Sequence, residues 1–195
     1  MFNIDKAFPS FLLETYFPEK GTTGKISPKE LSGKWAVFVF YPADFTFVCP
    51  TELADMARLY PEFKKRETEV IGVSTDTVYT HKGWLDTEEL LKDVTYPMAE
   101  DHTGSLAREL GVLYEESGKA QRATFIIDPD GILRAAEVVA DAIGRNGAET
   151  LRKLKALQFA RSHGGKVCPA AWEEGDATLS PGIQAAGHVA QQLKK

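Results

Sequence analysis

The sequence predicts an α/β fold in which helices flank a central mixed β-sheet. Two apolar runs rich in β-forming residues, 35–41 and 68–74, indicate buried strands. Between them, from about residue 49 to 66, apolar side chains recur at helical spacing, so the three segments form a strand, helix, strand unit of parallel type. Apolar segments at 122–127 and 132–139 indicate an antiparallel hairpin, which makes the sheet mixed.

The turn of the hairpin and the remaining elements follow from local signals. Asp128-Pro129-Asp130-Gly131 is typical of a tight turn. Helical periodicity predicts further helices at about 80–91, 103–110 and 146–161, and Gly164-Gly165 ends the last of them.

Periodicity weakens toward the C-terminus. Residues 164–195 contain five glycines and two prolines, a composition typical of an extended segment. We therefore expect one domain over residues 1–163 and a C-terminal arm over residues 164–195, with Cys168 in the arm.

Composition limits the classes of partner. The 195 residues carry a formal net charge of -5, and the charges are scattered, without the basic stripe that binds a nucleic acid backbone. The longest basic cluster, residues 64–66, falls at the end of a predicted helix, where cations face the negative end of the helix dipole. Apolar runs are too short to span a membrane, and the N-terminus lacks the pattern of a secretory signal. We expect a cytoplasmic protein that binds neither nucleic acid nor a membrane.

Two cysteines are too few for a disulfide scaffold, which favours a chemical role for them over a structural one. Cys49 stands where a predicted strand gives way to a helix, at the end of an α/β sheet where ligands bind. A helix N-terminus offers unpaired N–H groups and a partial positive charge, both of which favour a thiolate. The alternative is an inert cysteine, since free cysteine is among the most buried residue types.

The segment also offers groups that suit attack by a thiolate on an electrophilic atom. The leaving group gathers negative charge in such a step, so hydrogen-bond donors must surround both the sulfur and the leaving atom. Thr46, three residues before Cys49, offers a hydroxyl. Pro42 fixes the backbone at the strand exit, and its ring shields the nucleophile from water.

The segment around Cys49 resembles the signature of the peroxiredoxin family. That signature is a proline, three residues, a threonine, two residues and the peroxidatic cysteine, which matches residues 42–49 here. Residues 50–53, Pro-Thr-Glu-Leu, follow as in the typical two-cysteine group of the family.

Further matches cover nearly the whole chain. The strand that begins with Arg122 is similar to the family strand that opens with the active-site arginine, and residues 144–146 resemble the start of its late helix. Residues 166–172 and 175–179 closely resemble the resolving-cysteine arm of the alkyl hydroperoxide reductase C group. The resemblance implies a thioredoxin-like fold of the peroxiredoxin type.

By this resemblance Cys49 is the peroxidatic nucleophile, and three residues complete its pocket: Pro42, Thr46 and Arg122. An arginine keeps its charge at any working pH, so it can stabilise a thiolate and also donate to the peroxide oxygens.

One acidic residue, Glu52, and one basic residue, Arg145, match family residues that orient the active-site arginine through charge-assisted hydrogen bonds. Cys168 matches the resolving cysteine. In the family cycle, Cys49 becomes a sulfenic acid as the peroxide leaves as water or alcohol, and Cys168 of the partner subunit then condenses with it to an intersubunit disulfide. The first helical turn must unfold locally for the two sulfurs to reach disulfide distance.

The resemblance also implies partners. The chain is expected to form a homodimer, which in the family assembles further into a decamer of five dimers. Hydrogen peroxide and organic hydroperoxides are the implied substrates. The implied electron donor is a flavoprotein disulfide reductase similar to alkyl hydroperoxide reductase F, or thioredoxin.

We expect no bound cofactor and no metal. No glycine-rich loop follows a strand in phosphate-binding form, so a flavin or nicotinamide is not predicted. The four histidines show no metal-ligand spacing with Cys, Asp or Glu.

Departures from the family pattern carry a prediction. Residues 84–97 lack the Gly-Gly-Leu-Gly insertion of peroxide-sensitive relatives, and residues 187–195 lack their Tyr-Phe helix. Because both features slow local unfolding, their absence predicts an enzyme that resists conversion of Cys49 to sulfinic acid. Ala123 replaces a glycine of many relatives, and we expect little effect.

Two alternative functions remain at this point. A thioredoxin-like disulfide exchanger would carry its active cysteines two residues apart, unlike Cys49 and Cys168. A holdase or structural ring would retain the peroxidase residues, but its function would depend on the exposed apolar surface of the assembly. A Cys49→Ser variant separates the functions, because it abolishes peroxide turnover and spares a passive holdase.

Overall fold

The computed structural model describes residues 1–193. The last two positions of the expected arm lie outside the described residues. The chain divides into two compact units, Met1–Gly147 and a second unit that begins at Ala148.

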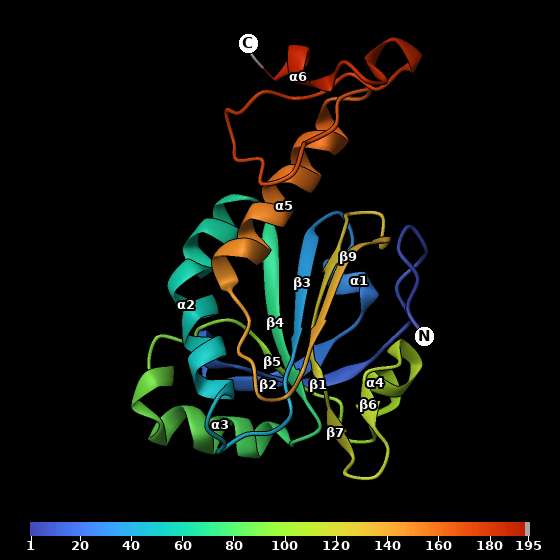
Figure 1. The fold of residues 1–195 in the computed structure, drawn as a ribbon. Coiled ribbons are helices and arrows are strands. Elements are labelled where there is room, and N and C mark those ends of the chain that lie inside the picture. The colour runs from blue at the N-terminus through green and yellow to red at the C-terminus, as the bar shows by residue number, and fades with distance from the viewer. Residues whose placement is uncertain (194–195) are drawn as a thin grey trace. The chain divides into compact units, whose positions relative to one another are not determined.

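The first unit is built on a seven-stranded mixed sheet, as the sequence predicted, with strand order β2-β1-β5-β4-β3-β8-β9 (Figure 1). Strands β3, β4 and β5 run parallel, and the other neighbours pair antiparallel. The sheet strands are β1 (Leu13–Phe17), β2 (Thr22–Ile26), β3 (Trp35–Phe40), β4 (Thr68–Ser74), β5 (Met98–Glu100), β8 (Arg122–Ile127) and β9 (Leu133–Val139). A separate two-stranded pair consists of β6 (Leu113–Tyr114) and β7 (Lys119–Ala120).

Helices connect these strands. The α-helices are α1 (Pro28–Leu31), α2 (Cys49–Lys65), α3 (Val78–Thr87), α4 (Ser105–Leu110), α5 (Gly147–Ser162) and α6 (Val189–Gln192). Short 3-10 helices are η1 (Pro18–Lys20), η2 (Glu89–Leu91) and η3 (Ile183–Ala185). Sequence periodicity had not indicated β1, β2, β5, the β6–β7 pair or α1, because these segments are too short to show a period.

The helix expected at 80–91 begins earlier and is divided. Thr77 is extended and caps α3 by accepting a hydrogen bond from the backbone of Thr80, which moves the start of the helix to Val78. Glu88 is also extended, with φ -91° and ψ 111°, and this backbone interrupts the helix before η2.

Alternation along β3 places side chains on both faces of the sheet. Ala36, Phe38 and Phe40 join an apolar cluster that includes Leu106 and Leu110 of α4. The opposite face is covered by α2, which packs on β4 and buries apolar side chains along its length (Figure 1). A strand covered on both faces has a continuous apolar sequence, as residues 35–40 do.

The second unit contains the C-terminal arm. Val167 and Leu179 exchange two backbone hydrogen bonds of 3.0 and 2.9 Å, which close the intervening residues into a loop. Trp172 lies in this loop, only 2% exposed, with its ring 5.0 Å from that of Phe159 on α5. The arm therefore has local structure that weak periodicity did not predict.

None of the helices in residues 1–193 is both long enough and apolar enough to span a lipid bilayer.

Candidate active site

Cys49 is the first residue of α2 and is completely buried. It follows the loop 41–48, which leaves the carboxyl end of β3. Pro50 follows Cys49, a position where proline suits a helix because the first turn leaves N–H groups without intrahelical acceptors. The sequence prediction placed Cys49 at this strand-to-helix junction correctly. The sulfur thus lies at the positive end of the helix dipole.

Arg122 brings a guanidinium to this sulfur. Its Nη1 donates to Cys49 Sγ over 3.2 Å. The pairing of β3 with β8 explains the contact: Phe40 lies opposite Ala123, so Arg122 stands beside the point where β3 ends and the loop toward Cys49 begins. No local signal in the sequence joins these two residues.

Arg122 is only 4% exposed and is held by acceptors on three sides. Besides Cys49, it donates from Nη1 to Glu52 Oε2 at 2.8 Å and from Nε to the carbonyl of Asp141 at 2.7 Å. Burial alone would lower the pKa of Arg122, but the contacts with Cys49 and Glu52 outweigh it and raise that pKa. The guanidinium is therefore a fixed positive charge beside the thiol.

Glu52 links the two arginines that the sequence singled out. It lies three residues after Cys49, on the same side of α2. Its Oε1 accepts from the backbone N–H and from Nε of Arg145 at 2.9 and 2.8 Å, while Oε2 faces Arg122. Burial would raise the pKa of Glu52, but hydrogen bonds from Arg145 and the charge of Arg122 lower it. Glu52 is therefore a buried carboxylate.

Arg145 completes this ion-pair cluster from the segment before α5. Its Nη1 donates to Thr124 Oγ1 over 3.1 Å. Thr124 lies two residues after Arg122 on β8, so both side chains point to the same face of the sheet. Sequence reasoning gave no role to Thr124, although it lies in the strand that resembles the family strand, and it did not single out Asp141.

Pro42 and Thr46 lie in the loop that precedes Cys49, and Pro42 is buried. The Thr46 hydroxyl donates to the carbonyl of Ala43 over 2.7 Å. The hydroxyl proton of Thr46 is engaged in this hydrogen bond, so the hydroxyl oxygen can only accept a hydrogen bond from another molecule. This differs from the donor role that the sequence suggested for Thr46.

Cys168 lies in the second unit as a free thiol, as Cys49 does in the first. Its Sγ donates to the carbonyl of Ala156 on α5, 3.6 Å away. Burial raises the pKa of Cys168, and the positive charge of Arg152 opposes this shift. A thiol rather than a thiolate is thus favoured at Cys168.

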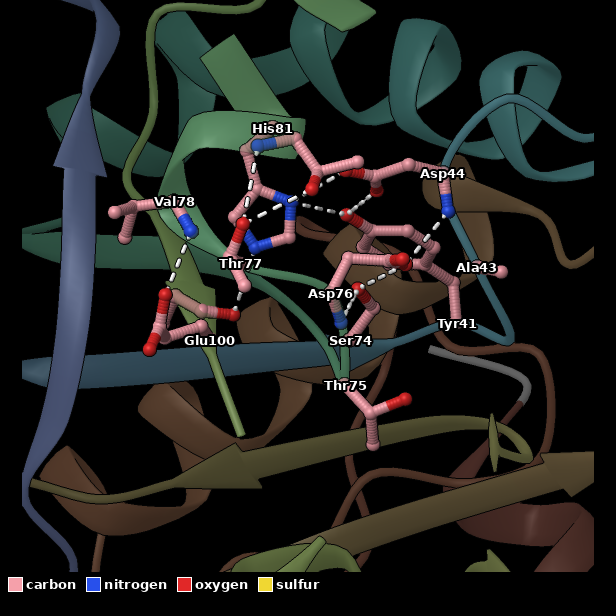
Figure 2. A network of polar contacts seen from close by, with 12 residues as sticks. Tyr41, Ala43, Asp44, Ser74, Thr75, Asp76, Thr77, Val78, His81 and Glu100 are labelled. Atoms are coloured by element: carbon pink, nitrogen blue, oxygen red, sulfur yellow. Dashed lines mark hydrogen bonds and ion pairs between the residues drawn. The ribbon is translucent and has the colours of Figure 1, made fainter. Parts of the chain in front are cut away.

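A second polar cluster, buried except for the partly exposed Asp76, was not predicted. It consists of Tyr41, Asp44, Ser74, Asp76 and His81, and Figure 2 shows it around the start of the loop that carries Thr46. The sequence offered His81 only as one of four scattered histidines, and its partners are distant along the chain.

These residues place a buried sulfur 3.2 Å from a permanent cation. A thiolate in this position can attack an electrophilic oxygen, and the guanidinium can stabilise the charge that develops on the departing one. Within residues 1–193, no group of three or more His, Cys, Asp and Glu side chains is placed to hold a metal ion.

Comparisons with known families match both parts of the chain. Residues 4–136 match the AhpC/TSA family, and residues 156–194 match the C-terminal domain of 1-Cys peroxiredoxin.

Individual relatives are similar over most of their length. Alkyl hydroperoxide reductase C of Escherichia coli is 50% identical over 165 residues, which cover 85% of this chain and 88% of the relative. The protein of the same name from Staphylococcus haemolyticus is 45% identical over 186 residues, or 95% and 98% of the two chains.

Solved structures of related proteins are similar to this chain in sequence and in fold. The crystal structure of Enterococcus faecalis AhpC has 44% identity and a TM-score of 0.82, covering 87% of this chain and all of that one, 100%. The reduced 2-Cys peroxiredoxin of Plasmodium vivax has 32% identity and a TM-score of 0.90 over 96% of this chain and 98% of that one.

Proposed function

Since this chain belongs to the AhpC/TSA family and is a peroxiredoxin-type thiol peroxidase, we propose that Cys49 is the sulfur that attacks the peroxide. The contact between Cys49 and Arg122 is the observation that carries this assignment. It joins a buried thiol at a helix N-terminus to a cation that stays charged, which is the kind of electropositive environment in which reactive cysteines lie.

In the proposed first step, the sulfur of Cys49 gives two electrons to the peroxide. A lone pair of the Cys49 thiolate attacks the terminal peroxide oxygen, a sulfur–oxygen bond forms, and the oxygen–oxygen bond breaks. The departing oxygen takes a proton and leaves as water or alcohol, while Cys49 becomes a sulfenic acid. Arg122 stabilises the charge on the sulfur and on the departing oxygen. Thr46 accepts a hydrogen bond from the peroxide, and Pro42 shields the sulfur from water.

Glu52 and Arg145 position Arg122 in this proposal. The carboxylate of Glu52 is shared between the two guanidiniums, so each fixes it from one side. With Glu52 in place, Nη1 of Arg122 lies between a carboxylate and the sulfur.

We further propose that Cys168 of the partner subunit resolves the sulfenic acid. Its thiol attacks the sulfur of Cys49, a disulfide forms and water leaves. Cys49 is completely buried, so the first turn of α2 must unfold before the sulfurs meet. The oxidised pair then takes two electrons from a flavoprotein disulfide reductase or from thioredoxin. A cytoplasmic location fits a cycle that needs thiols kept reduced.

A homodimer, assembling further into a decamer of five dimers, is the proposed oligomer. We keep the organisation into a peroxidase domain over residues 1–163 and a resolving arm over residues 164–195 as part of the same proposal.

Non-reducing electrophoresis after one equivalent of hydrogen peroxide tests the cycle. We expect a covalent dimer in the wild-type protein, and none in Cys49→Ser or Cys168→Ser. Peroxide consumption with a dithiol reductant should remain in Cys168→Ser and disappear in Cys49→Ser. A Cys49→Ser variant that consumes peroxide at the wild-type rate contradicts the assignment.

A further inference from the structure

A buried contact between His81 and Asp44 anchors the loop that precedes Cys49 (Figure 2). His81 Nδ1 lies 2.7 Å from Asp44 Oδ2, and both side chains are 0% exposed. Tyr41 donates its hydroxyl to the other oxygen of Asp44 over 2.7 Å. Burial, together with the charge of Asp44, raises the pKa of Tyr41 well above its usual value, so its hydroxyl keeps the donated proton.

His81 holds this loop against the sheet. Its Nε2 lies 3.3 Å from the carbonyl of Ala99 in β5, and a carbonyl can only accept. Each ring nitrogen thus faces an acceptor, the Asp44 carboxylate at Nδ1 and the Ala99 carbonyl at Nε2. The side chain of His81, on α3, therefore bridges Asp44 in the loop and Ala99 in the sheet.

The loop needs such an anchor, because its backbone is strained. Phe45 has φ +55°, a left-handed conformation that is costly for a residue with a large side chain. The neighbouring Asp44 is fixed through its backbone as well, since its N–H donates to Asp76 Oδ2 over 2.9 Å. Trp84 lies three residues after His81 on α3, and the centroid of its ring is 6.1 Å from that of Phe45.

A short chain of contacts joins this anchor to the proposed site. Asp44 directly follows Ala43, and the Ala43 carbonyl accepts the hydrogen bond from Thr46. Movement of Asp44 would therefore turn the Ala43 carbonyl and release the Thr46 hydroxyl.

We propose that His81 is a positioning residue of the peroxide site, acting through Asp44 to hold residues 41–48 in the conformation that directs Thr46 and covers Cys49. It touches neither the sulfur nor the substrate. The inference rests on the proposed function of Cys49, and it names a residue outside the motif that carries that function.

Opposite effects on two steps follow from this role. Attack on peroxide needs the closed loop, whereas disulfide formation needs the first turn of α2 to open. His81→Leu removes both contacts of the ring. It should lower the rate constant for peroxide attack by about tenfold and raise that for disulfide formation severalfold, because the loss of a buried hydrogen bond shifts the population toward the open loop.

Two amide variants separate the contacts of His81. Asparagine places an amide N–H near the position of Nδ1, within reach of Asp44, and glutamine places one near Nε2, toward Ala99. His81→Asn should therefore recover most of the attack rate that His81→Leu loses, and His81→Gln should recover less. If His81→Leu does not fold, Tyr41→Phe, which removes one donor to Asp44, should change both rates in the same directions.

Matched controls exclude a merely structural role. Val112→Ala removes buried apolar atoms in the core cluster away from the loop, and it should lower stability without changing the ratio of the two rates. Hydrogen exchange at the amides of residues 43–48 gives a readout that does not depend on turnover. At equal loss of melting temperature, it should accelerate in His81→Leu and not in Val112→Ala.

Several results would overturn the positioning role. They are wild-type exchange and wild-type rates in His81→Leu, equal rates in His81→Asn and His81→Gln, or the same change of ratio in Val112→Ala. If the wild-type protein itself consumes no peroxide, the proposed function fails, and the exchange experiment still decides whether His81 holds the loop.

Discussion

Replacement of Arg122 by methionine tests the proposed catalytic contact most directly. At 3.2 Å, a unit-charge pair interacts by about 5 kcal/mol at an effective dielectric constant of roughly 20. Desolvation of both groups offsets part of this energy, which leaves roughly 2–3 kcal/mol for a charge-assisted hydrogen bond. Because about 1.4 kcal/mol corresponds to a factor of ten in rate, Arg122→Met should slow attack on hydrogen peroxide roughly 30- to 150-fold.

The assay is a single turnover without reductant, in which the reaction is quenched at intervals and oxidised Cys49 is measured by mass spectrometry. Folding should survive, because Glu52 keeps its hydrogen bonds from Arg145. Arg134→Met is the matched control: this arginine pairs with Asp5 and Asp128 and makes no contact with the site, so its variant should keep the wild-type rate. A folded Arg122→Met variant that reacts at the wild-type rate refutes the role of Arg122.

Three further predictions follow. Thr46→Val should slow peroxide attack about tenfold in the same assay, because it removes the oxygen that accepts from the substrate, and Thr46→Ser should retain most of the rate; equal rates in both variants would count against a role for the hydroxyl. Glu52→Gln should destabilise the protein by about 3 kcal/mol in urea unfolding at neutral pH, since it leaves two buried guanidiniums sharing a neutral group. The folded-state pKa of Glu52 is depressed, so its stabilisation is present above the ordinary glutamate pKa and is lost as pH falls through the lower folded value; below pH 4 the difference between wild type and Glu52→Gln should shrink, and a difference independent of pH would show that Glu52 is not a carboxylate in the fold. Finally, the wild-type enzyme should continue to turn over under excess hydrogen peroxide without a gain of two oxygens on Cys49, and loss of activity at low peroxide with that gain in mass would contradict the expected resistance to over-oxidation.

Sequence reasoning found elements whose signal is contained within a few turns or strands. The two-sided apolar run of β3 and the periodicity of α2 predicted their bounds closely, since burial on both faces or on one helical stripe leaves its own pattern. It missed β5, which has three residues, because so short a strand shows no alternation. Sequence reasoning also continued the helix at 80–91 through Glu88, because no residue type near it indicates the extended backbone that the structure has there.

For the site, the motif pointed to candidate residues but not to all of their contacts. Thr46 was expected to donate its hydroxyl to the substrate, yet that hydroxyl donates to Ala43, a geometry that depends on how the loop folds. His81 was seen only as a scattered histidine, because its partner Asp44 is 37 residues away in sequence.

The sequence by itself determined the α/β class and the strand-to-helix junction at Cys49, since each depends on residues that are neighbours along the chain. Only the tertiary structure decided which distant groups meet there. The antiparallel pairing of β8 with β3 brings Arg122 to the sulfur, and α3 brings His81 to the loop. The physical reason is that strand register and helix docking follow from the burial of many side chains together, and no short stretch of sequence encodes that sum.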